Sequence, residues 1–360
     1  MSSQAEPEPL LRAFKIQART CDDLDAGFQA ALSRQIAEAV AAGDRLEDLF
    51  EPWAGRSVSQ LFADHAPLRL LAALHDLVLS GDAPELARAY PSAADAGDPA
   101  AAWLAARLLL SSARERIAAF MTHEPQTNEV RRSACLLGGF LTIAQETGLP
   151  LRTFELGASA GLNLYWDRFG YRLGPHRWGD PASPVQIDCD WSGPAPALAA
   201  PVKVASRAAC DRSPPNIADP AQRRRLLAYI WPGQFDRFAR IEAAMQVALD
   251  AGVRVEAADA AAWAATAAAP AAGAATVVYH SVFWQYLPEA TKAALTAAIE
   301  AHGAAAGAKA PFAWLRMEPP TKDVSVMQLR LTLWPDGRDR HLADVHPHGA
   351  YVHWRDGAGL

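Results

Sequence analysis

A string of mostly small residues at 153–164, Thr-Phe-Glu-Leu-Gly-Ala-Ser-Ala-Gly-Leu-Asn-Leu, constrains the fold more than any other feature of the chain. It begins like a buried strand, continues with glycines spaced for a tight turn, and ends in a new apolar run. The succession of strand, small-residue turn and helix start is typical of an α/β sheet that holds a ligand at the turn. The string therefore predicts both an α/β domain and the place of its first site.

The patterns on either side of this string differ. Before Pro150, residues 10–147 repeat apolar side chains at three- and four-residue spacing, which predicts helices, and 68–79 is apolar nearly all round, as in a central helix. After Pro150, short apolar runs alternate with amphipathic stretches, which indicates a sheet with crossover helices. The expected strands are 151–156, 202–209, 253–257, 276–280, 312–317, 327–334, 340–345 and 350–354, with a hairpin turn at Pro335-Asp336-Gly337.

This division predicts an all-helical N-terminal subdomain over 1–122 and an α/β domain over 123–360. Residues 165–201 interrupt the alternation, because they are rich in tryptophan, proline and glycine. We interpret them as an insertion, either a flap folded over the edge of the sheet or a surface loop.

Two chemistries fit the glycine string. The first is nucleotide binding, since Glu155-x-Gly157-x-Ser159-x-Gly161 is the E-x-G-x-G-x-G pattern with serine at its middle glycine. In Rossmann-like methyltransferases this turn holds S-adenosylmethionine, and an acid before the turn suits that cationic cofactor. We therefore expect a methyltransferase-type, mostly parallel sheet that ends in an antiparallel hairpin, with these four residues binding the cofactor.

Polar residues at the ends of later strands agree with this interpretation. Asp211 ends the second expected strand, where an acid can accept hydrogen bonds from ribose hydroxyls. Asp259 follows the third strand, where this class of enzyme often contacts adenine, and His280 ends the fourth. The carboxyl ends of parallel strands share one edge of the sheet, so these residues should lie together.

The second chemistry is ester or amide hydrolysis, because Gly157-Ala-Ser159-Ala-Gly161 also satisfies the G-x-S-x-G nucleophile elbow. Partners for Ser159 in the order serine, acid, histidine are available: Asp323 or Asp344, then His346 or His348. The elbow would lie on the first strand of the sheet, and the early strands of a hydrolase fold are missing. We therefore favour cofactor binding; a third hypothesis is a protein that binds the nucleoside without catalysis.

Several strings together resemble a known family. They are Gln126–Arg131, the string 155–164, Ala209–Asp211, Tyr229–Pro232, Tyr279–Leu287 and His346–Gly349. Together they are similar to a bacterial family of uncharacterised proteins, domain of unknown function 2332. The resemblance implies an α/β domain of methyltransferase type behind a helical N-terminal region, and it implies no particular substrate.

The polar string Gln126-Thr127-Asn128-Glu129 precedes an expected helix. Thr127 fits the cap of that helix, with Asn128 and Glu129 in its first turn. Four adjacent polar residues exceed what a cap needs. We therefore predict that Gln126, Asn128 and Glu129 face the substrate or the carboxylate of the cofactor.

Candidate catalytic residues follow the fourth and fifth strands. Histidine side chains commonly act as general bases at neutral pH, so His280 could accept a proton from the atom that receives the methyl group, and Glu318 could orient an amine or act as a base. Trp284 and Tyr286 could surround a methylsulfonium or an aromatic substrate through cation–π contacts, or simply belong to the core. Asp344-x-His346-x-His348 has metal-ligand types at alternating positions, but the intervening Pro347 and following Gly349 favour a turn, so we expect no metal.

Composition limits the partners. The formal net charge is −6, and neither half of the chain carries the basic stripe that nucleic-acid binding requires. Residues 260–288 contain no charged side chain but are mostly alanine, broken by Pro270 and Gly273, so we expect no transmembrane helix. The acidic N-terminus does not fit a secretory signal, and four cysteines without C-x-x-C spacing fit the reduced cytoplasm. A small-molecule substrate is the expected partner.

Overall fold

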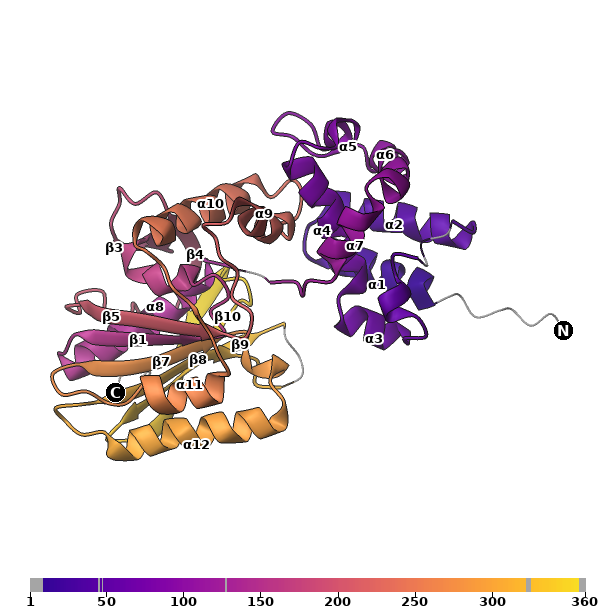
Figure 1. Cartoon of the computed structure of the whole chain (residues 1–360). Helices are drawn as coiled ribbons and strands as arrows, with labels where there is room; N and C mark the ends of the chain where they lie inside the picture. The colour runs from indigo at the N-terminus through magenta and orange to yellow at the C-terminus, as the bar shows by residue number, and fades with distance from the viewer. Residues whose placement is uncertain (1–8, 45, 47, 127, 322–324, 356–360) are drawn as a thin grey trace. The chain divides into compact units, whose positions relative to one another are not determined.

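The chain folds into two compact units that do not follow a single cut in the sequence (Figure 1). One unit comprises Met1–Thr127 and Ala218–Ala239, and the other comprises Asn128–Ile217 and Arg240–Leu360. Residues 218–239, which follow the second expected strand, thus pack with the N-terminal helices. The computed structural model describes residues 9–44, 46, 48–126, 128–321 and 325–355.

The first unit is built of helices around α4 (Ala66–Leu79), which buries Leu70, Leu71 and Leu74 completely. The predicted central helix is therefore confirmed. His65 adopts a left-handed φ of 53° and separates α4 from the short helix that precedes it. The other helices of this unit are α1 (Pro9–Asp23), α2 (Gly27–Ala41), η1 (Glu51–Trp53), α3 (Val58–Ala63), α5 (Pro84–Ala89), α6 (Pro99–Ser112), α7 (Arg114–Met121) and α9 (Pro220–Ala228).

In the part of the second unit that the structure describes, eleven strands form one sheet in the order β3-β2-β4-β11-β10-β9-β8-β7-β1-β5-β6. All eight strands expected from the sequence are present, although the third has only two residues. The strands are β1 (Leu151–Leu156), β2 (Gly170–Leu173), β3 (His176–Gly179), β4 (Gln186–Ser192), β5 (Val204–Asp211), β6 (Glu256–Ala257), β7 (Ala275–Ser281), β8 (Phe312–Glu318), β9 (Met327–Trp334), β10 (Arg338–Val345) and β11 (Tyr351–Trp354).

Strand β1 lies inside the parallel part of this sheet. It pairs in parallel with β5 on one side and β7 on the other, and β7 pairs in parallel with β8. The order β6-β5-β1-β7-β8 is the arrangement of a doubly wound sheet, in which ligands bind beyond the carboxyl ends of the strands. Beyond β8 the sheet becomes antiparallel through β9, β10 and β11, and the predicted hairpin turn joins β9 to β10.

The insertion 165–201 is neither a flap nor a plain surface loop. It contributes β2, β3 and β4, and β4 pairs in parallel with β11 at the far end of the sheet. The expected helix at its start is a 3₁₀ helix, η2 (Leu162–Arg168), with a kink at Tyr165. The insertion therefore enlarges the sheet.

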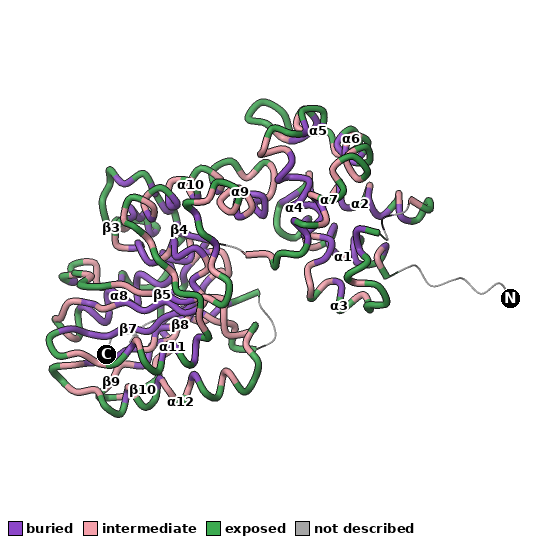
Figure 2. Tube along the Cα trace, viewed as in Figure 1, coloured by how far each residue is buried: buried purple, intermediate pink, exposed green. Residues whose placement is uncertain are grey.

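Helices cover both faces of the sheet, whose strands are largely buried (Figure 2). Helix α8 (Arg132–Thr147) approaches one face closely, because a Cβ at Gly139 would lie 2.3 Å from Leu315. On the other face, Phe154, Val278 and Phe312 form a core with two later helices. The helices of this unit other than α8 and η2 are α10 (Phe235–Asp250, which begins in the first unit), α11 (Ala260–Ala267), η3 (Trp284–Tyr286) and α12 (Glu289–Ala305).

Candidate functional site

The glycine turn lies directly after β1, at the carboxyl edge of the sheet. Gly157, Ser159 and Gly161 have positive φ angles of 64°, 51° and 72°. A Cβ at Gly157 would lie 2.2 Å from the ring of Phe283, so this position requires glycine for space as well as for conformation. The predicted tight turn is therefore present and is held against the segment that follows β7.

Two residues predicted separately from the sequence bind this turn. The Asn128 side chain donates from Nδ2 to Ser159 Oγ (2.9 Å) and accepts from the Ala160 N–H at Oδ1 (3.1 Å). The Ser159 N–H donates to Asp211 Oδ2 (2.8 Å), and the Ser213 N–H donates to Asp211 Oδ1 (2.9 Å). Asn128 and Asp211 thus lie together at the turn; the shared edge of parallel strands accounts for Asp211, whereas Asn128 precedes α8.

Glu155 lies beneath the turn and is only 4% exposed. Its Oε2 accepts a hydrogen bond from the Tyr279 hydroxyl (3.1 Å), on the neighbouring strand β7. Burial raises the pKa of Glu155 to about 8, and the nearby Asp211 adds to this, whereas the Tyr279 hydrogen bond and Arg132 oppose it. The free protein therefore holds mainly a neutral carboxylic acid at this position at neutral pH.

Asn163 and Glu129 continue this polar region. Asn163 Nδ2 donates to the backbone oxygen of Glu129 (3.4 Å), and its own backbone oxygen lies 3.5 Å from the Tyr279 hydroxyl. The backbone N–H of Arg131 donates to Glu129 Oε1 (3.1 Å). We call Glu155, Asn163, Tyr279 and Arg132 the Glu155 cluster. Sequence reasoning found only Glu155 among them, although strand alternation could have indicated Tyr279, which is paired with Glu155 in register.

His280 lies on the opposite face of the sheet from the Glu155 cluster. Successive residues of a strand point to opposite faces, and Tyr279 packs edge-on against Phe140 of α8. His280 is completely buried: its Nδ1 lies 2.6 Å from Glu318 Oε1, and its Nε2 accepts from Trp314 Nε1 (3.0 Å). Because Nε2 accepts, the imidazole is neutral and its proton is on Nδ1. His280 and Glu318 are brought together as predicted, but both ring nitrogens are engaged.

The two aromatic candidates have different environments. Trp284 stacks on His280, with ring centroids 5.5 Å apart and an interplanar angle of 15°, whereas Tyr286 is 66% exposed. The Glu318 carboxylate also accepts from the Phe283 N–H at Oε1 (3.0 Å) and Oε2 (3.2 Å). Glu318 therefore fixes the segment that carries Phe283 against the glycine turn.

The remaining predicted residues lie outside this arrangement. Asp259 accepts from the N–H groups of Ala261 and Ala262 (both 3.0 Å) and so caps α11. Gln126 is half-buried and belongs to the first compact unit. Thr127, the predicted cap, lies outside the described residues.

The residues suggested for a hydrolase elbow do not form a triad with Ser159 in the described parts of the chain. Asp344 is on β10, four strands from β1, and pairs with His341 (2.9 Å). His346 Nδ1 accepts from the His348 N–H (3.0 Å), and burial together with Arg131 lowers the His346 pKa. Asp323 lies outside the described residues. Within the described residues, no group of three or more metal-ligating side chains is arranged to hold a metal ion.

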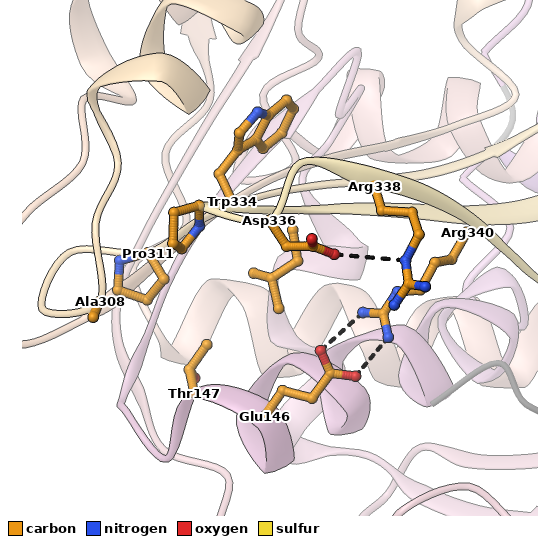
Figure 3. Close-up of a pocket in the computed structure, with 10 residues that line it drawn as sticks. Glu146, Thr147, Ala308, Pro311, Trp334, Asp336, Arg338 and Arg340 are labelled. Carbon is orange, nitrogen blue, oxygen red and sulfur yellow. Dashed lines mark hydrogen bonds and ion pairs between the residues drawn. The ribbon is translucent and has the colours of Figure 1, made fainter. Parts of the chain in front are cut away.

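A cavity of about 370 Å³ lies at the other end of the sheet (Figure 3). It is bounded by the end of α8, the segment before β8 and the β9–β10 hairpin, and Arg340 forms a two-pronged ion pair with Glu146 (2.7 and 2.9 Å). None of the cofactor-binding, substrate-binding or catalytic residues predicted from the sequence is among the residues that line it. Its position at the amino ends of the parallel strands separates it from the glycine turn.

Comparison with known proteins identifies the family. Residues 11–354 match the family described as "Uncharacterized protein conserved in bacteria", domain of unknown function 2332. The chain belongs to this family. The comparison with curated proteins gives no match, and the comparison with solved structures gives none either. The match confirms the family resemblance that six segments of the sequence indicate, and it covers both compact units. Of the helices that the structure describes in this DUF2332 protein, none is long and apolar enough to cross a membrane.

Proposed function

We propose that the second unit binds S-adenosylmethionine at the glycine turn and transfers its methyl group to a small-molecule acceptor. The observation that carries this proposal is the convergence of Asn128 and Asp211 on a left-handed turn after β1. Strand β1 has the central position of a doubly wound order, where such sheets bind nucleotides.

The side chains around the turn suit the parts of this cofactor. Each oxygen of Asp211 accepts one hydrogen bond from the backbone and can accept a second, as from a ribose hydroxyl. Glu155 supplies an acidic group beneath the turn for a cationic ligand. The cofactor would supply an activated methyl group, so the protein's main task is to align donor and acceptor rather than strong acid–base catalysis.

His280 and Glu318 remain our candidates for a catalytic pair. The Nδ1 of His280 is fixed by Glu318, which is the arrangement that orients a general base. Its Nε2 would become available only when Trp314 Nε1 moves away, because that donor occupies the lone pair here. Catalysis by His280 thus requires a rearrangement of Trp314.

Calorimetry with S-adenosylmethionine and S-adenosylhomocysteine tests the proposal. We expect both to bind the wild-type protein, and Asp211→Asn to weaken binding. Asp190→Asn is the matched control, since Asp190 is an exposed aspartate on β4 of the same sheet. Failure of the folded wild-type protein to bind either compound overturns the proposal. Binding without methyl transfer to any acceptor in a cell extract supports a nucleoside-binding protein instead.

One observation favours the hydrolase alternative. Ser159 has a left-handed φ of 51°, and a strained serine between glycines is characteristic of a nucleophile elbow. Covalent labelling by a fluorophosphonate distinguishes the two hypotheses. Labelling of wild-type protein that is lost in Ser159→Ala supports hydrolysis, whereas absence of labelling supports cofactor binding.

A further inference from the structure

The side-chain amide oxygen of Asn163 is a buried hydrogen-bond acceptor that no described donor contacts. This atom, Oδ1, is inaccessible to solvent and has no hydrogen-bond partner among the described residues. The orientation of the amide is fixed, because the backbone oxygen of Glu129 only accepts and therefore requires Nδ2 on its side. A buried oxygen without a donor is unfavourable, so its presence requires an explanation, and a ligand that supplies the missing donor is one.

A second acceptor group, the carboxyl of Glu155, lies near the backbone of Asn163. The Tyr279 hydroxyl contacts both Glu155 Oε2 (3.1 Å) and the Asn163 backbone oxygen (3.5 Å), so one phenol ties the two residues together. Glu155 is almost completely buried, and the paired Tyr279 is fully buried. Tyr279 thus holds the Glu155 carboxyl group next to Asn163, the residue whose amide oxygen lacks a donor.

We propose that Asn163 and Glu155 form a subsite for a primary ammonium group of the ligand. An ammonium has three N–H donors and one positive charge, which match an amide oxygen and a carboxylate. In the proposed cofactor this group is the α-amino group of its amino-acid end. The inference rests on the proposed function, and it identifies Asn163 as a binding residue that determines specificity.

Arrival of an ammonium should also displace a proton. The charged and titratable groups that face Glu155 are Tyr279 on β7, Asp211 on β5 and Arg132 at the start of α8. Burial raises the pKa of Glu155 to about 8, whereas a bound cation stabilises its carboxylate. At pH 7 about 0.9 proton should therefore leave per ligand bound.

The test compares S-adenosylhomocysteine with its deamino analogue, in which hydrogen replaces the amino group. We expect wild-type protein to bind the analogue about 10- to 100-fold more weakly, as for loss of hydrogen bonds to a charged group. Asn163→Ala should reduce the ratio of the two affinities by about tenfold, because it weakens binding of S-adenosylhomocysteine and leaves the affinity for the deamino analogue unchanged. Equal binding of the two compounds by wild-type protein overturns the subsite.

Proton release supplies a readout that needs no variant. Calorimetry at pH 7 in two buffers of different ionisation enthalpy should show release with S-adenosylhomocysteine and none with the deamino analogue. Glu155→Gln should abolish the release, whereas Glu256→Gln, an exposed glutamate on β6, should retain it. Absence of release by wild-type protein that binds S-adenosylhomocysteine overturns the role of Glu155. Absence of binding of either compound overturns the proposed function itself, so the two failures are distinguishable.

Discussion

The buried carboxyl group of Glu155 should make the second unit less stable as the pH rises. In the unfolded chain its pKa is 4.5, and in the folded protein burial raises the pKa to about 8. Between these values the folded state holds one proton more than the unfolded state, so the free energy of unfolding falls with pH. The replacement Glu155→Gln keeps the shape and removes the ionisation.

The magnitude follows from the shift. Each pKa unit corresponds to about 1.36 kcal/mol, so the raised pKa of Glu155 lowers the free energy of unfolding by about 1 kcal/mol at pH 5 and by about 4 kcal/mol at pH 8. The stability of Glu155→Gln relative to the wild-type protein should therefore increase by about 3 kcal/mol across this range. Other titrating groups are common to both proteins and cancel in the difference.

Urea unfolding followed by tryptophan fluorescence measures this difference. Eight of the 11 tryptophans lie in the second unit, so the signal reports chiefly the unit that contains Glu155. Glu256→Gln is the control, since Glu256 is an exposed glutamate in the same sheet. Parallel pH profiles for the wild-type protein and Glu155→Gln between pH 5 and 8 would refute the reasoning.

Three further predictions concern the turn, a helix cap and the first unit. Gly157→Ala should destabilise the protein by more than the roughly 1–2 kcal/mol expected for Gly273→Ala in thermal unfolding, because Gly273 has a similar positive φ but open space around its Cβ. Asp259→Ala should cost about 1 kcal/mol as a lost helix cap while the affinity for S-adenosylhomocysteine stays unchanged; a large loss of affinity would instead place Asp259 at the cofactor. Burial lowers the pKa of His75 from 6.5 to about 4, so the free energy of unfolding of the first unit should fall by up to about 3 kcal/mol as the pH falls from 6.5 to 4. Amide hydrogen exchange of α4 measures this change, and exchange rates that do not respond to it would contradict the lowered pKa of His75.

The sequence predicts the parallel part of the sheet well, for a physical reason. Strand β1 is largely buried and pairs on both sides, and Pro150 and Gly157 mark the ends of its six residues in the sequence. The meeting of Asp211 and Ser159 follows from the same geometry, because parallel strands place their carboxyl ends at one edge.

The insertion could not be predicted from local patterns. Strand β4 finds its partner in β11, where Asp190 pairs with Tyr351 across about half of the chain. Such a distant pairing leaves no trace in composition, and the neighbouring β2 and β3 have only four residues each. The glycine- and tryptophan-rich composition of this segment is typical of a loop, and only the pairing of β4 with β11 identifies it as part of the sheet.

The placement of the candidate catalytic residues shows how strand alternation divides a site. Sequence reasoning selected His280 for its chemistry, yet the residue before it, Tyr279, is the one that reaches Glu155 beneath the glycine turn. His280 points to the other face, where Glu318 also holds the Phe283 segment against Gly157. A change at His280 would thus be transmitted to the turn through Glu318 and Phe283, even without direct contact between His280 and a ligand. Loss of activity in a His280 variant would therefore not by itself establish His280 as a catalytic base. A changed pH dependence of activity, with the affinity for the ligand retained, would establish that role.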